Sequence, residues 1–281
     1  MKNWGFCDLC VTAPDNTDNL KDILLRLQKA GYNTVVINQN VDEAVFENEK
    51  KKKKKTVEID TFCPVPEPID VSELKNLFKG KLNILSRITF SFSDPVKTHS
   101  MNQLTVLKKY NIYAVIPKTQ AAFQFACSQL GADIILINST SSGLKWSRKL
   151  YFQAVEKGIH FEIQYAPVIK NSTRKLAIHV SHLCYTFGKS KNIIISSGAN
   201  DPSVIRNPYD VINLARMLGL DESKAKMAIL QQAHHVLAKG GSLLLKVDVL
   251  EKLSLKFNAV RLIDLTARRK KGKNSKPKIR C

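Results

Sequence analysis

The chain has 281 residues, of which 44% are apolar, and it carries a formal net charge of +20 at pH 7. A chain of this length and composition can bury a sizeable core, as one large α/β domain or two small ones, so an entirely disordered protein is excluded. Six lysines at 50–55 and eight basic residues at 268–280 carry most of the excess charge, which leaves a moderately basic body.

Apolar, β-branched and aromatic runs predict seven strands that alternate with helical patterns. The predicted strands are residues 6–11, 34–38, 82–92, 112–116, 133–138, 160–165 and 192–196. Helical patterns lie between most of these strands, at residues 20–31, 104–107, 123–131 and 176–187. This alternation predicts parallel pairing of the strands.

Two capped helices are predicted after the last strand. Asn207 is a good N-cap, Pro208 suits the first helical position, and Gly219 ends the first of these helices. Asp221 then caps a second helix, which we expect to run towards Gly240.

The number of units favours a TIM-barrel-like α/β fold, closed or nearly closed, over an open doubly wound sheet, although seven strands are one fewer than a regular barrel has. We expect residues 1–240 to form this single domain. Residues 40–80 are irregular and proline-rich, so we expect a surface excursion that carries the lysine run. Residues 241–281 are expected to form a basic C-terminal segment with a flexible end.

The third predicted strand contains a charged side chain in its middle. Residues 82–92 place leucine, isoleucine and phenylalanine on one face, and Arg87 falls on the other face. A guanidinium group is costly to bury without a partner. Two roles are therefore open for Arg87: a structural ion pair inside the barrel, or a ligand contact at its polar mouth.

Several familiar kinds of site are not indicated. The phosphate-binding patterns G-x-x-x-x-G-K-[ST] and G-x-G-x-x-G do not occur, so nucleotide hydrolysis by those routes is not expected. Cys7 and Cys10 resemble half of a zinc site, but no second pair follows them. His179 and His182 share one helix face without a carboxylate to complete a metal site. We therefore predict no metal site, and core positions for the cysteines.

The lysine run and the basic tail are blocks of like charge, which stay solvated and act as arms for anionic partners or as nuclear import signals. A merely solvated loop is the alternative. Neither arm has the interleaved apolar face that beds into lipid, so we favour nucleic acid over a membrane. The sequence contains no apolar stretch of about 18 residues, no leader pattern at its start and no disulfide framework, so we expect a soluble intracellular protein.

Basic side chains follow several of the predicted strands. Lys118 follows the fourth strand, Lys170 and Arg174 follow the sixth, and Arg206 follows the seventh. Functional groups of such barrels gather at the carboxyl ends of the strands, so this rim could hold phosphates. Each long side chain could instead simply lie over a helix end. Together with the two arms, the rim favours binding of RNA or DNA.

Several segments resemble a known family. They are Gly31-Tyr32-Asn33-Thr34-Val35-Val36-Ile37-Asn38, Arg87-Ile88-Thr89, the run from Pro167 to Arg174, and the run from Ile194 to Leu220. The most specific part of the likeness is the stretch from Arg206 to Ser223. Over residues 6–238 the chain resembles the TIM-barrel protein subunit shared by eukaryotic and archaeal ribonuclease P and, in eukaryotes, by ribonuclease MRP. The lysine run and the tail after Gly241 lie outside the resemblance.

The resemblance implies a non-catalytic subunit of a ribonucleoprotein. In that complex the ribonuclease P RNA removes the 5′ leader from precursor tRNA, while this subunit and other protein subunits stabilise the RNA fold. It further implies a part in ribonuclease MRP and rRNA processing, indirect contact with precursor tRNA, and a place in the nucleus and nucleolus. No cofactor is expected on this subunit, since Mg²⁺ is expected at the catalytic RNA. The residues carried over as RNA or partner contacts are Arg87, Lys118, Lys170, Arg174 and Arg206.

Two other functions are considered. The body is also similar to metal-dependent phosphoesterases of the polymerase and histidinol phosphatase type, which suggests a phosphoesterase or nuclease active as a single chain. Those enzymes carry His-x-His on the first strand, where this chain has Asp8-Leu9-Cys10. The last possibility is a nuclear scaffold that binds another protein and whose arms serve only for import.

Overall fold

The computed structural model describes residues 4–14, 17–45, 65–96, 98, 105–141 and 143–240. The lysine run at 50–55 and the basic segment 241–281, with its expected flexible end, lie outside the described residues. The described residues form one compact unit that ends at Gly240. Within these ranges, no helix combines the length and the apolar character needed to cross a bilayer.

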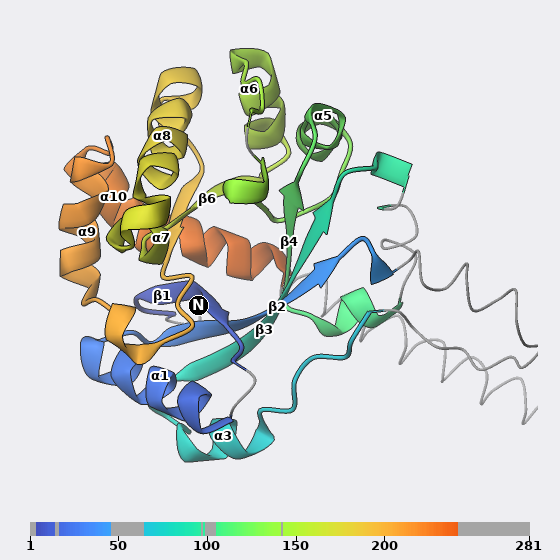
Figure 1. The fold of residues 1–281 in the computed structure, drawn as a ribbon. Coiled ribbons are helices and arrows are strands. Elements are labelled where there is room, and N and C mark those ends of the chain that lie inside the picture. Colours follow the sequence, from blue (N-terminus) through green and yellow to red (C-terminus); the bar gives the residue numbers. More distant parts are fainter. Residues whose placement is uncertain are drawn as a thin grey trace, which may run out of the picture. The chain divides into compact units, whose positions relative to one another are not determined.

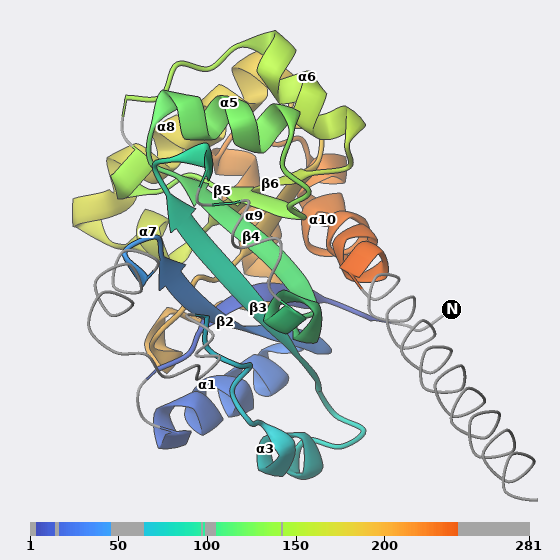
Figure 2. The ribbon, with the colours of Figure 1, turned by 90° about the vertical axis from the view of Figure 1, so that its right-hand side faces the viewer.

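Seven parallel strands form one sheet whose spatial order follows the sequence, which confirms the predicted α/β barrel (Figure 1). The strands are β1 (Cys7–Thr12), β2 (Thr34–Asp42), β3 (Asn83–Phe92), β4 (Ile112–Pro117), β5 (Ile134–Leu136), β6 (His160–Gln164) and β7 (Ile193–Ser196). Figure 2 shows β2, β3 and β4 side by side, in continuous parallel register. The fifth strand is shorter than the sequence predicts, and the second is longer.

The barrel is nearly closed by the segment that follows β7, which takes the place of an eighth strand. Gly198 N donates to Cys10 O at 2.9 Å, and Thr12 N donates to Ala199 O at 2.9 Å. Val11 and Ala199 form a parallel bridge. Seven strands therefore suffice, because residues 197–199 join the last strand to the first.

Helices surround the sheet, as the sequence predicts for crossover connections (Figure 1). They are α1 (Thr17–Ala30), α3 (Ser72–Leu77), α5 (Gln120–Ser128), α6 (Arg148–Glu156), α7 (Ala166–Ile169), α8 (Asn171–Gly188), α9 (Pro208–Met217) and α10 (Glu222–Ile229), with short 3₁₀ turns η1 (Thr105–Lys109), η2 (Ser139–Ser141) and η3 (Pro202–Val204). The helical pattern expected near residues 104–107 is thus a 3₁₀ turn. The caps of α9 and α10 are confirmed: Asn207 accepts from Tyr209 N at 2.9 Å, and Asp221 accepts from Lys224 N at 2.8 Å.

The segment 40–80 is more regular at its two ends than the sequence suggests. Strand β2 continues to Asp42, and α3 forms near the end of the segment. Val71 and Phe78 are buried against Leu82 and α1 side chains such as Leu24. These apolar residues hold the end of the segment to the barrel. The sequence did not indicate this packing, because prolines and lysines dominate the residues before them.

The inside of the barrel is apolar at the amino ends of its strands. Val36, Ile112, Ile134 and Ile194 pack there against a further helical stretch at residues 231–240, which contributes Ala233, Val236 and Leu237. The single helix expected from Asp221 to Gly240 is therefore wrong: it breaks at Leu230, whose φ and ψ are −116° and −88°. The break redirects the chain so that the second stretch covers the interior residues, a requirement that helical periodicity alone does not reveal.

Candidate nucleic-acid interface

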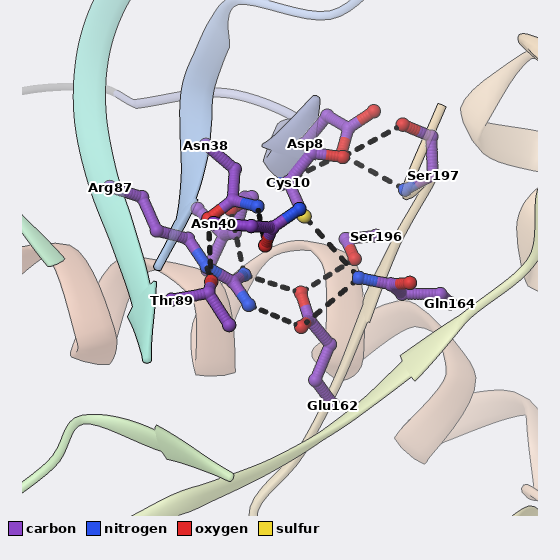
Figure 3. A network of polar contacts seen from close by, with 11 residues as sticks. Asp8, Cys10, Asn38, Asn40, Arg87, Thr89, Glu162, Gln164, Ser196 and Ser197 are labelled. Atoms are coloured by element: carbon purple, nitrogen blue, oxygen red, sulfur yellow. Dashed lines mark hydrogen bonds and ion pairs between the residues drawn. The ribbon is translucent and has the colours of Figure 1, made fainter. Parts of the chain in front are cut away.

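A buried ion pair occupies the interior of the barrel beyond this apolar layer. Arg87 on β3 and Glu162 on β6 both have side chains with 0% exposure. Two parallel hydrogen bonds join them, from Nη1 to Oε1 and from Nη2 to Oε2, each 2.6 Å long (Figure 3). The two strands are not neighbours in the sheet, so this fork-shaped contact spans the barrel interior.

The remaining polar atoms around the pair are also engaged. Arg87 donates from Nε to Thr89 Oγ1 at 3.1 Å and from Nη1 to the Leu9 carbonyl at 3.0 Å. Ser196 donates to Glu162 Oε1 at 2.7 Å, and Thr89 donates to Asn38 Oδ1 at 2.5 Å. Five strands thus contribute to one hydrogen-bonded network. These hydrogen bonds offset the free-energy cost of removing the two charges from water.

Of the two roles open for Arg87, the structure shows the buried ion pair. Its guanidinium has no exposed surface, so this placement gives no route for Arg87 to touch an RNA or a partner. Both oxygens of Glu162 accept hydrogen bonds from that guanidinium. The positive charge in this part of the barrel is therefore supplied by the Arg87 side chain. Among the described residues, no group of three or more His, Cys, Asp or Glu side chains is arranged to hold a metal ion.

Asp8 lies at the seam where the segment after β7 meets β1. Its Oδ1 accepts from Ser197 N at 3.0 Å and from Cys10 N at 3.2 Å, whereas its buried Oδ2 has no hydrogen-bond partner. Burial raises the pKa of Asp8 to about 6, and the hydrogen bonds from Ser197 and Cys10 only partly offset this effect. Cys10 is buried in the same network, and Cys7 lies in the apolar layer, where burial raises the pKa of its thiol to about 12.

Two of the predicted contact residues, Lys170 and Arg174, lie outside the barrel at the start of α8. Lys170 is the exposed residue at the junction of α7 and α8, and Arg174 lies in the first turn of α8. Arg206 lies in the segment before α9, where its backbone N donates to the hydroxyl of Tyr165 at 3.3 Å. Asp201 of the same segment lies near Lys170: hydrogen bonds within the segment lower the pKa of that carboxyl, and the charge of Lys170 lowers it further. We call Lys170, Arg174 and Arg206 the α8 basic cluster.

The first turn of α8 is unusual in its charge. It contains no acidic residue, and no side chain caps it, although the helix is 18 residues long. The amino end of a long helix carries partial positive charge and free N–H groups, so carboxylates normally favour this position. Here lysine and arginine stand instead, which makes the start of α8 attractive to an external anion such as a phosphate.

The arginines of the α8 basic cluster are fixed in place. Arg174 donates to the carbonyl oxygens of Val168 at 2.8 Å and Ile169 at 2.7 Å. Arg206 donates to the carbonyl oxygens of Ser203 at 2.7 Å and Ile205 at 3.1 Å. Each guanidinium is therefore ordered before any ligand arrives.

Lys118 lies apart from the α8 basic cluster. It follows β4, two strands away from β6, and forms an ion pair with Asp42 at the end of β2. Its side chain is about one quarter exposed at 24%. The structure thus places Lys170 and Arg174 together at the start of α8 and Arg206 in the segment before α9, buries Arg87 and ties Lys118 to a carboxylate.

Sequence reasoning did not identify Glu162 as the partner of Arg87. The alternation His160, Glu162, Gln164 along β6 places these polar residues on one face of a strand, which was the available signal. Arg26 and Lys29 of α1 were also missed, although they line a polar surface pocket together with Arg206. Their proximity arises from the packing of α1 against the segment before α9, which no local pattern reveals.

Truncating one member of the buried pair is expected to be far more harmful than replacing both. Glu162→Ala leaves a buried guanidinium unpaired and should lower the free energy of unfolding by about 3–5 kcal/mol. The double variant Arg87→Met/Glu162→Met removes both charges and should recover much of that loss. Urea unfolding of the three proteins measures this, and a Glu162→Ala loss below about 1 kcal/mol would contradict the account.

The raised pKa of Asp8 predicts that the free energy of unfolding depends on pH with a sign opposite to that produced by a salt-bridged carboxylate. Between about pH 4 and pH 6 the folded state binds this proton and the unfolded state releases it, so stability falls as pH rises through this window. Asp8→Asn keeps an oxygen for both backbone N–H groups. Its stability advantage over the parent should therefore grow by roughly 2–3 kcal/mol from pH 4 to pH 6.

Comparing the two proteins cancels the contribution of His160, whose pKa burial lowers to about 4 and which is present in both. Denaturant titrations at each pH provide the measurement. An advantage that stays constant over this range would refute the assignment of the shift to Asp8.

Comparison with known proteins identifies relatives over most of the chain. The sequence model of a family described as RNase P subunit p30 matches residues 5–243. The mouse ribonuclease P protein subunit p30 is 32% identical over 249 residues, which cover 84% of this chain and 86% of that protein. The Saccharomyces cerevisiae ribonuclease P/MRP protein subunit RPP1 is 25% identical and covers 79% of this chain and 73% of its own length.

A solved structure supports the same fold. A chain in a cryo-EM structure of archaeal ribonuclease P with mature tRNA matches with a TM-score of 0.61 and 15% identity, covering 84% of this chain and 92% of that one. At this identity the structural match shows the fold, while the sequence matches show the family. The chain belongs to the RNase P subunit p30 family.

Proposed function

We propose that this protein is a non-catalytic subunit of the ribonuclease P ribonucleoprotein, which supports RNA-catalysed removal of the 5′ leader from precursor tRNA. The observation that carries the proposal is membership of the RNase P subunit p30 family over residues 5–243. The likeness to a ribonuclease P/MRP subunit supports a second place in ribonuclease MRP and rRNA processing. Nuclear and nucleolar localisation is part of the same proposal.

The barrel supports a bracing role better than a hydrolytic one. A metal-dependent phosphoesterase needs free carboxylates or histidines as ligands, and here both oxygens of Glu162 are bound by Arg87. What the described surface offers is fixed positive charge. Backbone carbonyls order Arg174 beside the uncapped start of α8 and Arg206 in the segment before α9, which suits contact with RNA phosphates.

The partners that follow from the proposal are the ribonuclease P RNA, the ribonuclease MRP RNA and the other protein subunits, with precursor tRNA contacted indirectly. Lys170, Arg174 and Arg206 remain our proposed RNA or partner contacts. Lys118 is a weaker candidate, because a phosphate must compete with Asp42 for it. Mg²⁺ belongs to the catalytic RNA in this proposal.

Charge reversal of the α8 basic cluster tests the proposal. Tagged full-length protein should recover the ribonuclease P and MRP RNAs from nuclear extract, as read by RNA sequencing. The triple variant Lys170→Glu/Arg174→Glu/Arg206→Glu should recover at least about tenfold less of both, because it replaces three phosphate-attracting charges with repelling ones. Thermal unfolding of the variant reports whether the fold is intact.

The matched control reverses three exposed lysines around α3, Lys75, Lys79 and Lys81, and so changes the net charge equally. It should recover the RNAs at a level near that of the parent protein. Recovery of bulk RNA only by the parent would refute the proposed function. Undiminished recovery by a folded cluster variant would instead refute the contact residues.

A further inference from the structure

The loop between α8 and β7 holds an unusual backbone conformation. Lys189, Ser190 and Asn192 have positive φ angles of 51°, 55° and 50°. Non-glycine residues rarely adopt this left-handed region, because the Cβ atom crowds the backbone there. Such conformations persist only where the surrounding structure enforces them, and they cluster at functional sites.

Several contacts enforce the loop. The hydroxyl of Tyr151 donates to the Lys191 carbonyl at 2.6 Å, and Ser190 N donates to the Cys184 carbonyl at 3.2 Å. Asn192 Nδ2 donates to the Ile159 carbonyl at 3.3 Å. Gly188 lies so close to the Tyr151 ring that an added Cβ would stand 2.0 Å from it. The loop is therefore pre-organised, and it displays Lys189 and Lys191 outward.

The two exposed lysines of the loop are laid over aromatic rings. Lys189 Nζ lies 5.0 Å from the ring centre of Tyr185, and Lys191 Nζ lies 5.3 Å from that of Phe152. Arg148 lies over the same Phe152 ring at 5.5 Å. Cation–π contacts restrict these long side chains without neutralising their charge. Less side-chain freedom is then lost when an anion binds.

A cavity of about 140 Å³ lies beside this loop, lined by polar and apolar residues: Ser190, Lys191, Asn192, Ile193, Lys224, Met227 and Gln232. Ser190 is 5% exposed, and its hydroxyl has no hydrogen-bond partner in the described part of the chain. A buried hydroxyl without a partner is costly, which calls for an acceptor from outside the chain. Lys224 is paired with Asp221 at 3.0 Å, so Lys189 and Lys191 supply the uncompensated charge.

We propose that the cavity at Ser190, flanked by Lys189 and Lys191, binds a backbone phosphate of the RNA in the complex; this inference rests on the proposed function. The Ser190 hydroxyl donates to one phosphate oxygen, and the ammonium groups of Lys191 and Lys189 donate to others. A phosphate has several acceptor oxygens, so it can accept from the Ser190 hydroxyl and from the lysines of the loop at the same time.

The proposed site lies at the opposite end of the barrel from Lys170 and Arg174 of the α8 basic cluster. The loop precedes β7, whereas Lys170 and Arg174 follow β6, and the two strands run parallel. The RNA would then contact both ends of the barrel across its α8 side. Two fixed contacts on one rigid body brace an RNA more effectively than one, because they fix its orientation as well as its position.

Equilibrium binding of the full chain to ribonuclease P RNA tests the site. Lys189→Gln/Lys191→Gln should weaken binding and lower the slope of log affinity against log salt by roughly 0.7–0.9, the value for one lost phosphate contact. Ser190→Ala removes only the hydroxyl donor and should weaken binding by roughly threefold to tenfold with the salt slope retained. The control Lys75→Gln/Lys79→Gln should leave both quantities near those of the parent.

The outcomes separate the two proposals. If the parent prefers ribonuclease P RNA over bulk RNA and both loop variants bind as it does, the phosphate site is refuted and the proposed function stands. If the parent shows no such preference, both fail. A further arm measures the rise in melting temperature caused by inorganic phosphate. A rise that the loop variants lose, with RNA affinity unchanged, assigns the cavity to free phosphate and overturns the inference.

Discussion

The structure depends most on the buried pair of Arg87 and Glu162. Two charges inside a barrel are tolerated only when each donor and acceptor is satisfied, and here residues of β1, β2, β3, β6 and β7 take part in the network. The pair therefore does more than fill space. It links strands from opposite sides of the barrel. It also engages both oxygens of the Glu162 carboxylate, a group that could otherwise bind a ligand or transfer a proton.

The two halves of the barrel interior are specialised in different ways. The half at the amino ends of the strands is apolar and is covered by residues 231–240, which continue the chain after the break at Leu230. The half at the carboxyl ends is polar, and it adjoins a cavity of about 100 Å³ that Glu162, Gln164 and residues of α8 line. One end thus supplies apolar packing, and the other has a polar interior in which Arg87 binds both oxygens of Glu162.

The sequence sufficed for the fold class, because strand and helix periodicities, the caps at Asn207 and Asp221 and the spacing of the seven strands are local signals. The partner of Arg87 depends on the placement of distant strands, so periodicity put the arginine on the face opposite the apolar side chains, left both of its roles open and could not identify Glu162. The same limit explains the Leu230 break, where burial of Leu237 in the barrel outweighs helical continuity. The strained loop at Ser190 could not be predicted from the sequence, because its left-handed residues are lysine, serine and asparagine instead of glycine.

The central claim is that the barrel interior serves only to hold the fold, while fixed cationic groups on the surface hold the RNA. The most direct measurement is the affinity of the folded Arg87→Met/Glu162→Met protein for ribonuclease P RNA, compared with that of the parent. The account predicts that a variant shown to be folded binds within about twofold of the parent, because no charge that touches RNA has changed. A folded double variant that has lost RNA binding would contradict the account, since the interior pair would then have a role beyond stability.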